Sequence, residues 1–180
     1  MRITGGAWRG RRLKPLKSFK GRPTTDFARE GLFNLLRSRV KLGEARVLDL
    51  FAGTGMVGME CASRGAASVT AIEKQRQACS YIKGCYEDLG YEGAVTVLNI
   101  NVFKYIDSAV ASFDLIFADP PYDLKNLGSI PSKVREAGLL NKEGILVLEH
   151  GTYDNFHRED GFVEIRKFGH VHFSFFTFES

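Results

Sequence analysis

The sequence is poor in cysteine and in long apolar runs. Its three cysteines, Cys61, Cys79 and Cys85, are odd in number and lack the paired C-x-x-C spacing of a disulfide or metal framework. The first residues contain no apolar signal run, and no stretch reaches the length needed to span a membrane. We therefore expect a protein of the reducing cytoplasm with no membrane partner.

Motifs for metal binding and for nucleophilic catalysis are also missing. The four histidines, at positions 150, 157, 170 and 172, show no zinc-type spacing with the cysteines. Local sequence indicates neither a Ser-His-Asp nor a Cys-His arrangement. We therefore expect no bound metal and no catalytic nucleophile of these two types.

Acidic side chains are absent from the amino-terminal end, where basic ones accumulate. The net charge of the chain is only +4, but residues 1–41 hold twelve Lys and Arg against two acidic residues. Residues 1–22 contain eight basic side chains and no acidic one, interleaved with Ile3, Trp8, Leu13 and Phe19. Such a mixture suits phosphates and bases. The arginines that we expect to bind a nucleic acid are Arg9, Arg11, Arg12 and Arg22.

A solvated basic tail that keeps the protein soluble is the alternative interpretation of this charge run. Trp8 and the glycines at positions 5, 6 and 10 favour a small hairpin over an extended arm. We therefore expect one domain over residues 1–180, in which residues 1–22 form a basic extension that docks nucleic acid and residues 23–180 form the core.

Apolar runs alternate with helix-compatible segments through most of the chain. The pattern predicts strands over residues 46–50, 68–73, 94–98, 113–118 and 144–149. Helices are predicted over residues 27–40, 56–63, 75–89 and 102–110, with a helix-compatible stretch at 124–137. Residues 162–168 and 171–178 are strand-like and aromatic, and the short Gly-His separator between them predicts an antiparallel hairpin. These elements predict an α/β protein with a mostly parallel sheet.

Glycines follow the first predicted strand directly, at positions 53, 55 and 58. A turn there needs unusual backbone angles, and a ligand must approach the main chain closely, so the pattern is typical of a nucleotide-binding loop. The spacing also satisfies the dinucleotide fingerprint, with Glu73 near the position of a ribose ligand. Asp49, beside the loop, is poorly placed to share space with a pyrophosphate and suits a cation. S-adenosyl-L-methionine, which carries a sulfonium and an ammonium but no phosphate, fits better, although the pattern alone leaves both cofactors open.

Further candidate ligands follow the other parallel strands, whose carboxyl ends meet at one edge of such a sheet. Glu73 ends the second strand and can accept hydrogen bonds from two ribose hydroxyls. Asn101 follows the third strand and can hydrogen-bond the adenine edge, with Val102 packed against the adenine face. The alternative for Asn101 is a turn or helix-cap residue.

The fourth strand ends at the tetrapeptide that runs from Asp119 to Tyr122 and contains two prolines. Consecutive prolines fix two φ angles and remove two N-H donors, so the Pro120 carbonyl can be presented rigidly to a ligand. Asp119 and this carbonyl can accept both protons of an exocyclic amine and direct its lone pair toward an electrophilic methyl group. Tyr122 would stack on the base. The alternative is a Pro-rich stop after a buried strand.

With these motifs the chain resembles the class I S-adenosylmethionine-dependent methyltransferases that modify exocyclic amines. Within them it is similar to the bacterial RsmD type, which methylates guanine N2 of 16S ribosomal RNA. The resemblance covers most of the chain and rests on residues 1–3, 22–26, 29–30, 32–34, 48–55, 63–66, 113–117 and 119–122, together with Gly6, Gly10, Gly58 and Glu60.

The resemblance implies a Rossmann-like, seven-stranded fold with a carboxyl-terminal antiparallel hairpin, and 16S rRNA in the small ribosomal subunit or an assembly intermediate as partner. It also implies roles for single residues. The cofactor ligands would be Asp49, Phe51, Ala52, Gly53, Gly55 and Glu73. The target amine would be bound by Asp119, Pro120 and Tyr122.

Two positions depart from this family's pattern. Asn101 stands where an aspartate usually binds the adenine amine, and Cys85 stands near a common asparagine.

Three alternative functions stay open. The protein could be a DNA methyltransferase that acts on adenine N6 or cytosine N4, a non-catalytic ribosome-assembly protein with this fold, or a nicotinamide oxidoreductase.

Overall fold

The computed structural model describes residues 1–16, 24–91, 94–152 and 154–178. Its strands are β1 (Arg46–Leu50), β2 (Ser68–Glu73), β3 (Ala94–Asn99), β4 (Phe113–Ala118), β5 (Leu140–His150), β6 (Phe162–Phe168) and β7 (Val171–Phe176). Its α-helices are α1 (Asp26–Leu36), α2 (Met56–Ser63), α3 (Arg76–Leu89), α4 (Val102–Ser108) and α5 (Ile130–Glu136). Two 3-10 turns, Leu42–Glu44 and Leu127–Ser129, precede β1 and α5.

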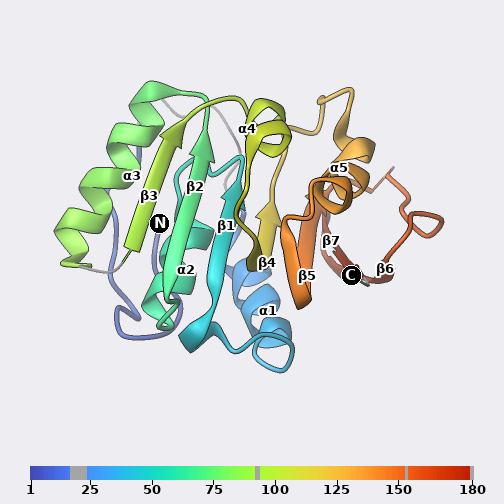
Figure 1. The fold of residues 1–180 in the computed structure, drawn as a ribbon. Helices are drawn as coiled ribbons and strands as arrows, with labels where there is room; N and C mark the ends of the chain where they lie inside the picture. Colours follow the sequence, from blue (N-terminus) through green and yellow to red (C-terminus); the bar gives the residue numbers. More distant parts are fainter. Residues whose placement is uncertain (17–23, 92–93, 153, 179–180) are drawn as a thin grey trace.

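All seven strands join one sheet in the order β3-β2-β1-β4-β5-β7-β6 (Figure 1). The first five strands run parallel, and β7 pairs antiparallel with both β5 and β6. Helices α1, α2 and α3 pack on one face of the sheet, and α4 and α5 pack on the other. The predicted α/β sheet with a carboxyl-terminal hairpin is therefore confirmed. In the described ranges no helix is both long enough and apolar enough to span a bilayer.

Several element boundaries differ from the prediction, among them those of α5, which begins at Ile130 and not at residue 124. Helix α1 ends at Leu36 because the chain turns there, and the amide of Arg39 donates to the Leu36 carbonyl. Strand β5 begins at Leu140, which pairs with Phe113. A bulge that contains Glu143, at φ +64°, separates this first pairing from the regular ladder. Residues 140–143, which lie before the predicted strand, are therefore part of the sheet.

The basic amino-terminal segment folds as a hairpin that is fastened to the body of the protein. Arg2 and Arg12 form an antiparallel bridge, and the amide of Ile3 donates to the Arg11 carbonyl at 2.9 Å. The side chain of Ile3 is fully buried and that of Leu13 nearly so. These two apolar side chains of the basic segment therefore contribute to the hydrophobic core.

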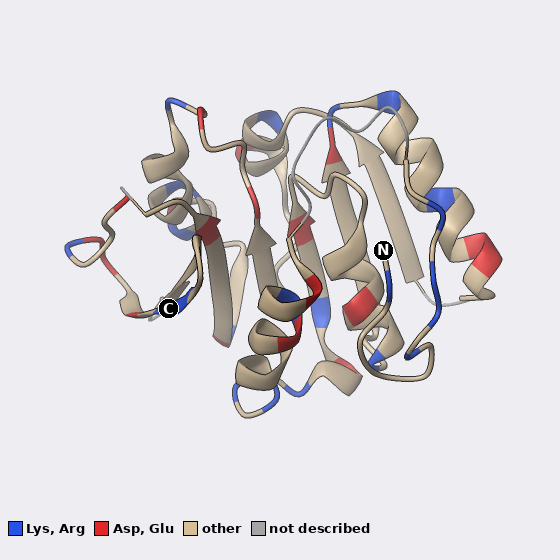
Figure 2. Cartoon of the chain, turned by 180° about the vertical axis from the view of Figure 1, so that it is seen from behind, with Lys and Arg blue, Asp and Glu red and all other residues tan. Residues whose placement is uncertain are grey.

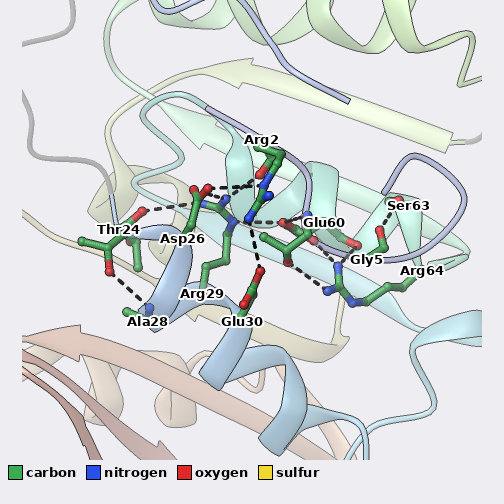
Figure 3. Close-up of polar contacts among 12 residues, drawn as sticks. Arg2, Gly5, Thr24, Asp26, Ala28, Arg29, Glu30, Glu60, Ser63 and Arg64 are labelled. Atoms are coloured by element: carbon green, nitrogen blue, oxygen red, sulfur yellow. Dashed lines mark hydrogen bonds and ion pairs between the residues drawn. The ribbon is translucent and has the colours of Figure 1, made fainter. Parts of the chain in front are cut away.

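A buried ion pair anchors the hairpin to α1 and α2 (Figure 3). Arg29 donates from Nε to Glu60 at 3.0 Å and from Nη2 to the Arg2 carbonyl at 2.6 Å. Glu60 also accepts from the amide of Thr4 at 2.6 Å and from the guanidinium of Arg64. The exposed fraction of the side chain is 2% for Arg29 and zero for Glu60. This pair therefore joins three segments that are distant in the sequence.

Replacing Arg29 by Met is expected to lower the free energy of unfolding by about 3 kcal/mol, because it leaves a buried Glu60 carboxylate with fewer donors. Urea unfolding followed by circular dichroism measures the change. The control is Arg2→Ala, which removes an exposed ion pair with Glu30 and should cost less than about 1 kcal/mol. Equal losses in the two variants would contradict a special role for the buried pair.

Candidate active site

Four acidic side chains gather at the carboxyl edge of the parallel strands. They are Asp49 in β1, Glu73 in β2, Asp119 directly after β4 and Glu149 in β5. Side chains alternate along a strand, and the residue two positions before each acid lies in the core beneath α1, α2 and α3. The four acids therefore face the same side of the sheet, and acidic segments mark the tips of these strands in Figure 2. We call these four residues the acidic edge.

The loop after β1 and the first turn of α2 need glycine for two reasons, a positive φ angle and close packing. Gly55 has φ +71°, and a Cβ there would lie 2.9 Å from Cγ1 of Ile82. At Gly58 a Cβ would lie 2.9 Å from Cγ1 of Val69, while the Gly58 amide donates to Asp49 at 3.1 Å. Phe51, a bulky residue, also has positive φ, at +61°. Backbone strain of this kind is typical of ligand sites.

Glu73 holds this loop in place. Its carboxylate accepts from the amide of Gly53 at 2.9 Å and from the amide of Gln75 at 2.7 Å. The two bonds connect the glycine loop to the start of α3. Each carboxylate oxygen has a second lone pair, so the group can still accept from a ligand.

Asn101 caps helix α4, which was the alternative interpretation of this residue. Its side-chain oxygen accepts from the amides of Phe103 at 2.9 Å and Lys104 at 3.3 Å. Val102 is buried among the apolar residues beneath α4 and α5. Contacts of both residues with adenine stay predictions.

The segment after β4 meets two residues that sequence reasoning missed, Glu149 and Thr24. Glu149 accepts from the Tyr122 hydroxyl at 3.4 Å and from the Thr24 hydroxyl at 2.8 Å. Pro120 is buried, Asp119 is partly buried, and the Tyr122 side chain lies 56% exposed. The sequence does contain a signal for Glu149. This acid follows the apolar run of β5, much as Asp49 follows Val47 and Leu48 in β1.

The acidic edge is short of positive charge. Burial and the charge of Glu73 raise the pKa of Asp49 to about 7, against the opposing effect of the hydrogen bond from Gly58. Burial raises the pKa of Asp119 well above its ordinary value, and Glu149 and Asp49 add to the effect. Burial also raises the pKa of Glu149 to about 7, although its two hydroxyl partners lower it. No Lys or Arg of the described ranges forms a salt bridge with these acids. A bound cation would supply the missing charge.

Comparison with known proteins places the chain. A family model described as "Conserved hypothetical protein 95" matches residues 1–177. Ribosomal RNA small subunit methyltransferase D of Escherichia coli K12 is 35% identical over 149 residues, which are 83% of this chain and 74% of that protein. The chain belongs to the ribosomal RNA small subunit methyltransferase D family.

Solved structures agree with this membership. The Escherichia coli protein yhhF is 31% identical, covers 98% of this chain and 96% of its own, and superposes with a TM-score of 0.84. SMU.776, solved in complex with SAH, is only 15% identical, with a TM-score of 0.63 over 78% of this chain and 48% of its own. That likeness shows a shared fold. The fold of this ribosomal RNA small subunit methyltransferase D family member is therefore the class I methyltransferase fold.

The amino-terminal arginines of this family member do not lie at the acidic edge. Arg11 donates to the carbonyl of Asp88 at 2.9 Å, near the carboxyl end of α3. This end of α3 lies on the side of the amino-terminal ends of the parallel strands, away from the acidic edge (Figure 1). Arg9 lines a cavity of about 650 Å³ together with Arg37, Lys41 and Arg64. The predicted contact at Arg22 lies outside the described residues.

Proposed function

We propose that this protein transfers the methyl group of S-adenosyl-L-methionine to the exocyclic N2 amine of a guanine in 16S rRNA, within the small ribosomal subunit or an assembly intermediate. The observation that carries the proposal is the position of Asp119, which directly follows β4 and lies near the buried Asp49 and the glycine loop. Pro120 comes next and restricts the backbone there. Family membership supports rRNA as the substrate.

The residues of the acidic edge suit this cofactor. When bound, S-adenosyl-L-methionine supplies a methyl group on a sulfonium whose leaving group is a neutral thioether. A buried carboxylate without a cationic partner, such as Asp49, would pair with the ammonium or sulfonium charge. The loop residues Phe51, Ala52, Gly53 and Gly55 would line the same site, Glu73 would accept from the ribose hydroxyls, and Asn101 with Val102 would border the adenine.

The amine would be oriented by acceptors on this chain. The Asp119 carboxylate and the Pro120 carbonyl would each accept one N-H, which directs the nitrogen lone pair toward the methyl group. The exposed ring of Tyr122 would stack on the base. Positioning supplies most of the acceleration in this arrangement, because the thioether leaves readily without metal assistance.

Transfer of labelled methyl from S-adenosyl-L-methionine to unmodified small ribosomal subunits and to undermethylated duplex DNA, followed by nucleoside analysis, tests the proposal. N2-methylguanosine in the RNA alone is expected. Methyladenine or methylcytosine in the DNA would show that the substrate is DNA and not rRNA. Cofactor binding without any methyl transfer would favour the non-catalytic alternative.

RNA docking is proposed for the exposed arginines of the amino-terminal hairpin, among them Arg9 and Arg12, and for the cavity that Arg9 lines together with Arg37, Lys41 and Arg64. Replacing Arg9 and Arg12 by Glu is expected to weaken RNA binding and to lower the slope of log affinity against log salt by about 1 to 2, because each phosphate contact contributes about 0.7 to 0.9. Arg11 is left intact because it holds the end of α3.

Filter binding of small-subunit RNA at several salt concentrations measures the slope, and calorimetry measures cofactor affinity, which should not change. The control carries the same change of charge at the exposed Lys142 and Lys167 in the other half of the sheet. Equal loss of RNA affinity in the control and test variants would mean that the effect comes from net charge and not from a docking site at Arg9 and Arg12.

A further inference from the structure

Glu149 is a buried acid for which the mechanism above has no use. Leu148 pairs in register with Ala118, so Glu149 and Asp119 follow this pair on adjacent parallel strands and face the same side of the sheet. The side chain of Glu149 is only 2% exposed. Strands in a sheet lie about 4.8 Å apart, so the longer Glu149 side chain can reach the same ligand as Asp119.

Two hydroxyl groups fix the orientation of this carboxylate. Thr24 donates to Oε2 and Tyr122 donates to Oε1, so both oxygens are engaged and each keeps a further lone pair. Thr24 is held in turn, because its carbonyl accepts from Nη1 of the buried Arg29 at 3.3 Å. The Glu149 carboxylate is therefore a hydrogen-bond acceptor with a fixed orientation. It lies next to the residues that would bind the amine and stack on the base.

The ring atom beside the exocyclic amine separates guanine from its rivals. Guanine has an N1-H donor next to its N2 amine, whereas adenine has an N1 acceptor next to N6 and cytosine has an N3 acceptor next to N4. A carboxylate accepts hydrogen bonds from the guanine pattern and repels the lone pair of the other two. A third acceptor, in addition to Asp119 and the Pro120 carbonyl, therefore favours guanine.

We propose that Glu149 is a specificity-determining residue whose carboxylate accepts the N1-H of the target guanine while Asp119 and the Pro120 carbonyl hold its N2 amine. This inference rests on the proposed function. It assigns the choice of base to a residue outside the Asp119–Tyr122 segment. A site built to accept a proton rejects a substrate that lacks it far more strongly than apolar contacts can.

2-Aminopurine tests the assignment, because it keeps the 2-amine of guanine but has an acceptor at N1. The nucleotide that the wild-type protein methylates is mapped first on unmodified small subunits, and 2-aminopurine is then placed there in ligated 16S rRNA reassembled into subunits. The wild-type protein is expected to prefer guanine by at least about 100-fold in kcat/KM. Glu149→Gln, which replaces one acceptor by a donor, should lower that preference at least tenfold.

The outcomes separate this inference from the function on which it rests. Absence of N2-methylguanine with the wild-type protein overturns the proposed function itself. Normal methylation of guanine with an unchanged preference in Glu149→Gln overturns only the role of Glu149. Tyr122→Phe keeps the carboxylate and removes one of its donors, so it should lower activity on both bases while it preserves most of the preference. A merely structural role of Glu149 would reduce both activities equally.

Discussion

Asp119→Ala is expected to lower kcat/KM for methyl transfer by about 10²- to 10⁴-fold, with the affinity for S-adenosyl-L-methionine nearly unchanged. The carboxylate is proposed to hold one of the two amine protons, and loss of orientation and of a proton-binding group typically costs this much. Single-turnover transfer of labelled methyl to unmodified small subunits measures the rate, and calorimetry measures cofactor binding.

The fold of this variant should survive, because the substitution removes an acid that Glu149 and Asp49 repel. The matched control is Asp123→Ala, which removes an exposed acid four positions further along the chain. Transfer within about threefold of wild type in Asp119→Ala would show that the amine is oriented by other groups.

Asp49→Asn is expected to make the cofactor-free protein more stable at pH 8 and to weaken binding of S-adenosyl-L-methionine at least about 100-fold. Burial raises the pKa of Asp49 from 3.8 in the unfolded reference to about 7 in the folded protein. Between these values the folded state binds more protons than the unfolded state, so the wild-type protein loses stability as the pH rises through this window. The amide variant lacks that loss.

The stability advantage of the variant should therefore grow by roughly 2 to 3 kcal/mol between pH 5 and pH 8, at about 1.4 kcal/mol for each pKa unit crossed. Urea unfolding at the two pH values gives the difference. The amide oxygen can still accept from the Gly58 amide, so that hydrogen bond is retained. A variant that is less stable than wild type by the same amount at both pH values would mean that the Asp49 charge is compensated inside the fold.

Local patterns predict the centre of the sheet well. The bounds of β1, β2 and β4 agree with the apolar runs in the sequence, because these strands are buried on both faces. The start of β5 was missed because Leu140 is held by its pairing with Phe113, and nothing in the neighbouring sequence indicates that pairing.

The candidate site divides in the same way. Asp49, Glu73 and Asp119 could be placed together because parallel strands bring their carboxyl ends to one edge. Thr24 and Glu149 are 125 positions apart, and only the folded chain shows that they are hydrogen-bonded.

The strand order has a consequence for synthesis of the protein on the ribosome. β1 lies between β2 and β4, so a nascent chain that has just completed β3 still has one side of β1 unpaired. Helix α1 stays partly uncovered for longer, since Phe27 packs edge-on against Phe168 of β6 at 5.9 Å. Unpaired strand edges invite wrong pairing. Chains stalled before residue 113 should therefore depend on chaperones, and the Thr24–Glu149 contact should form only near the end of translation.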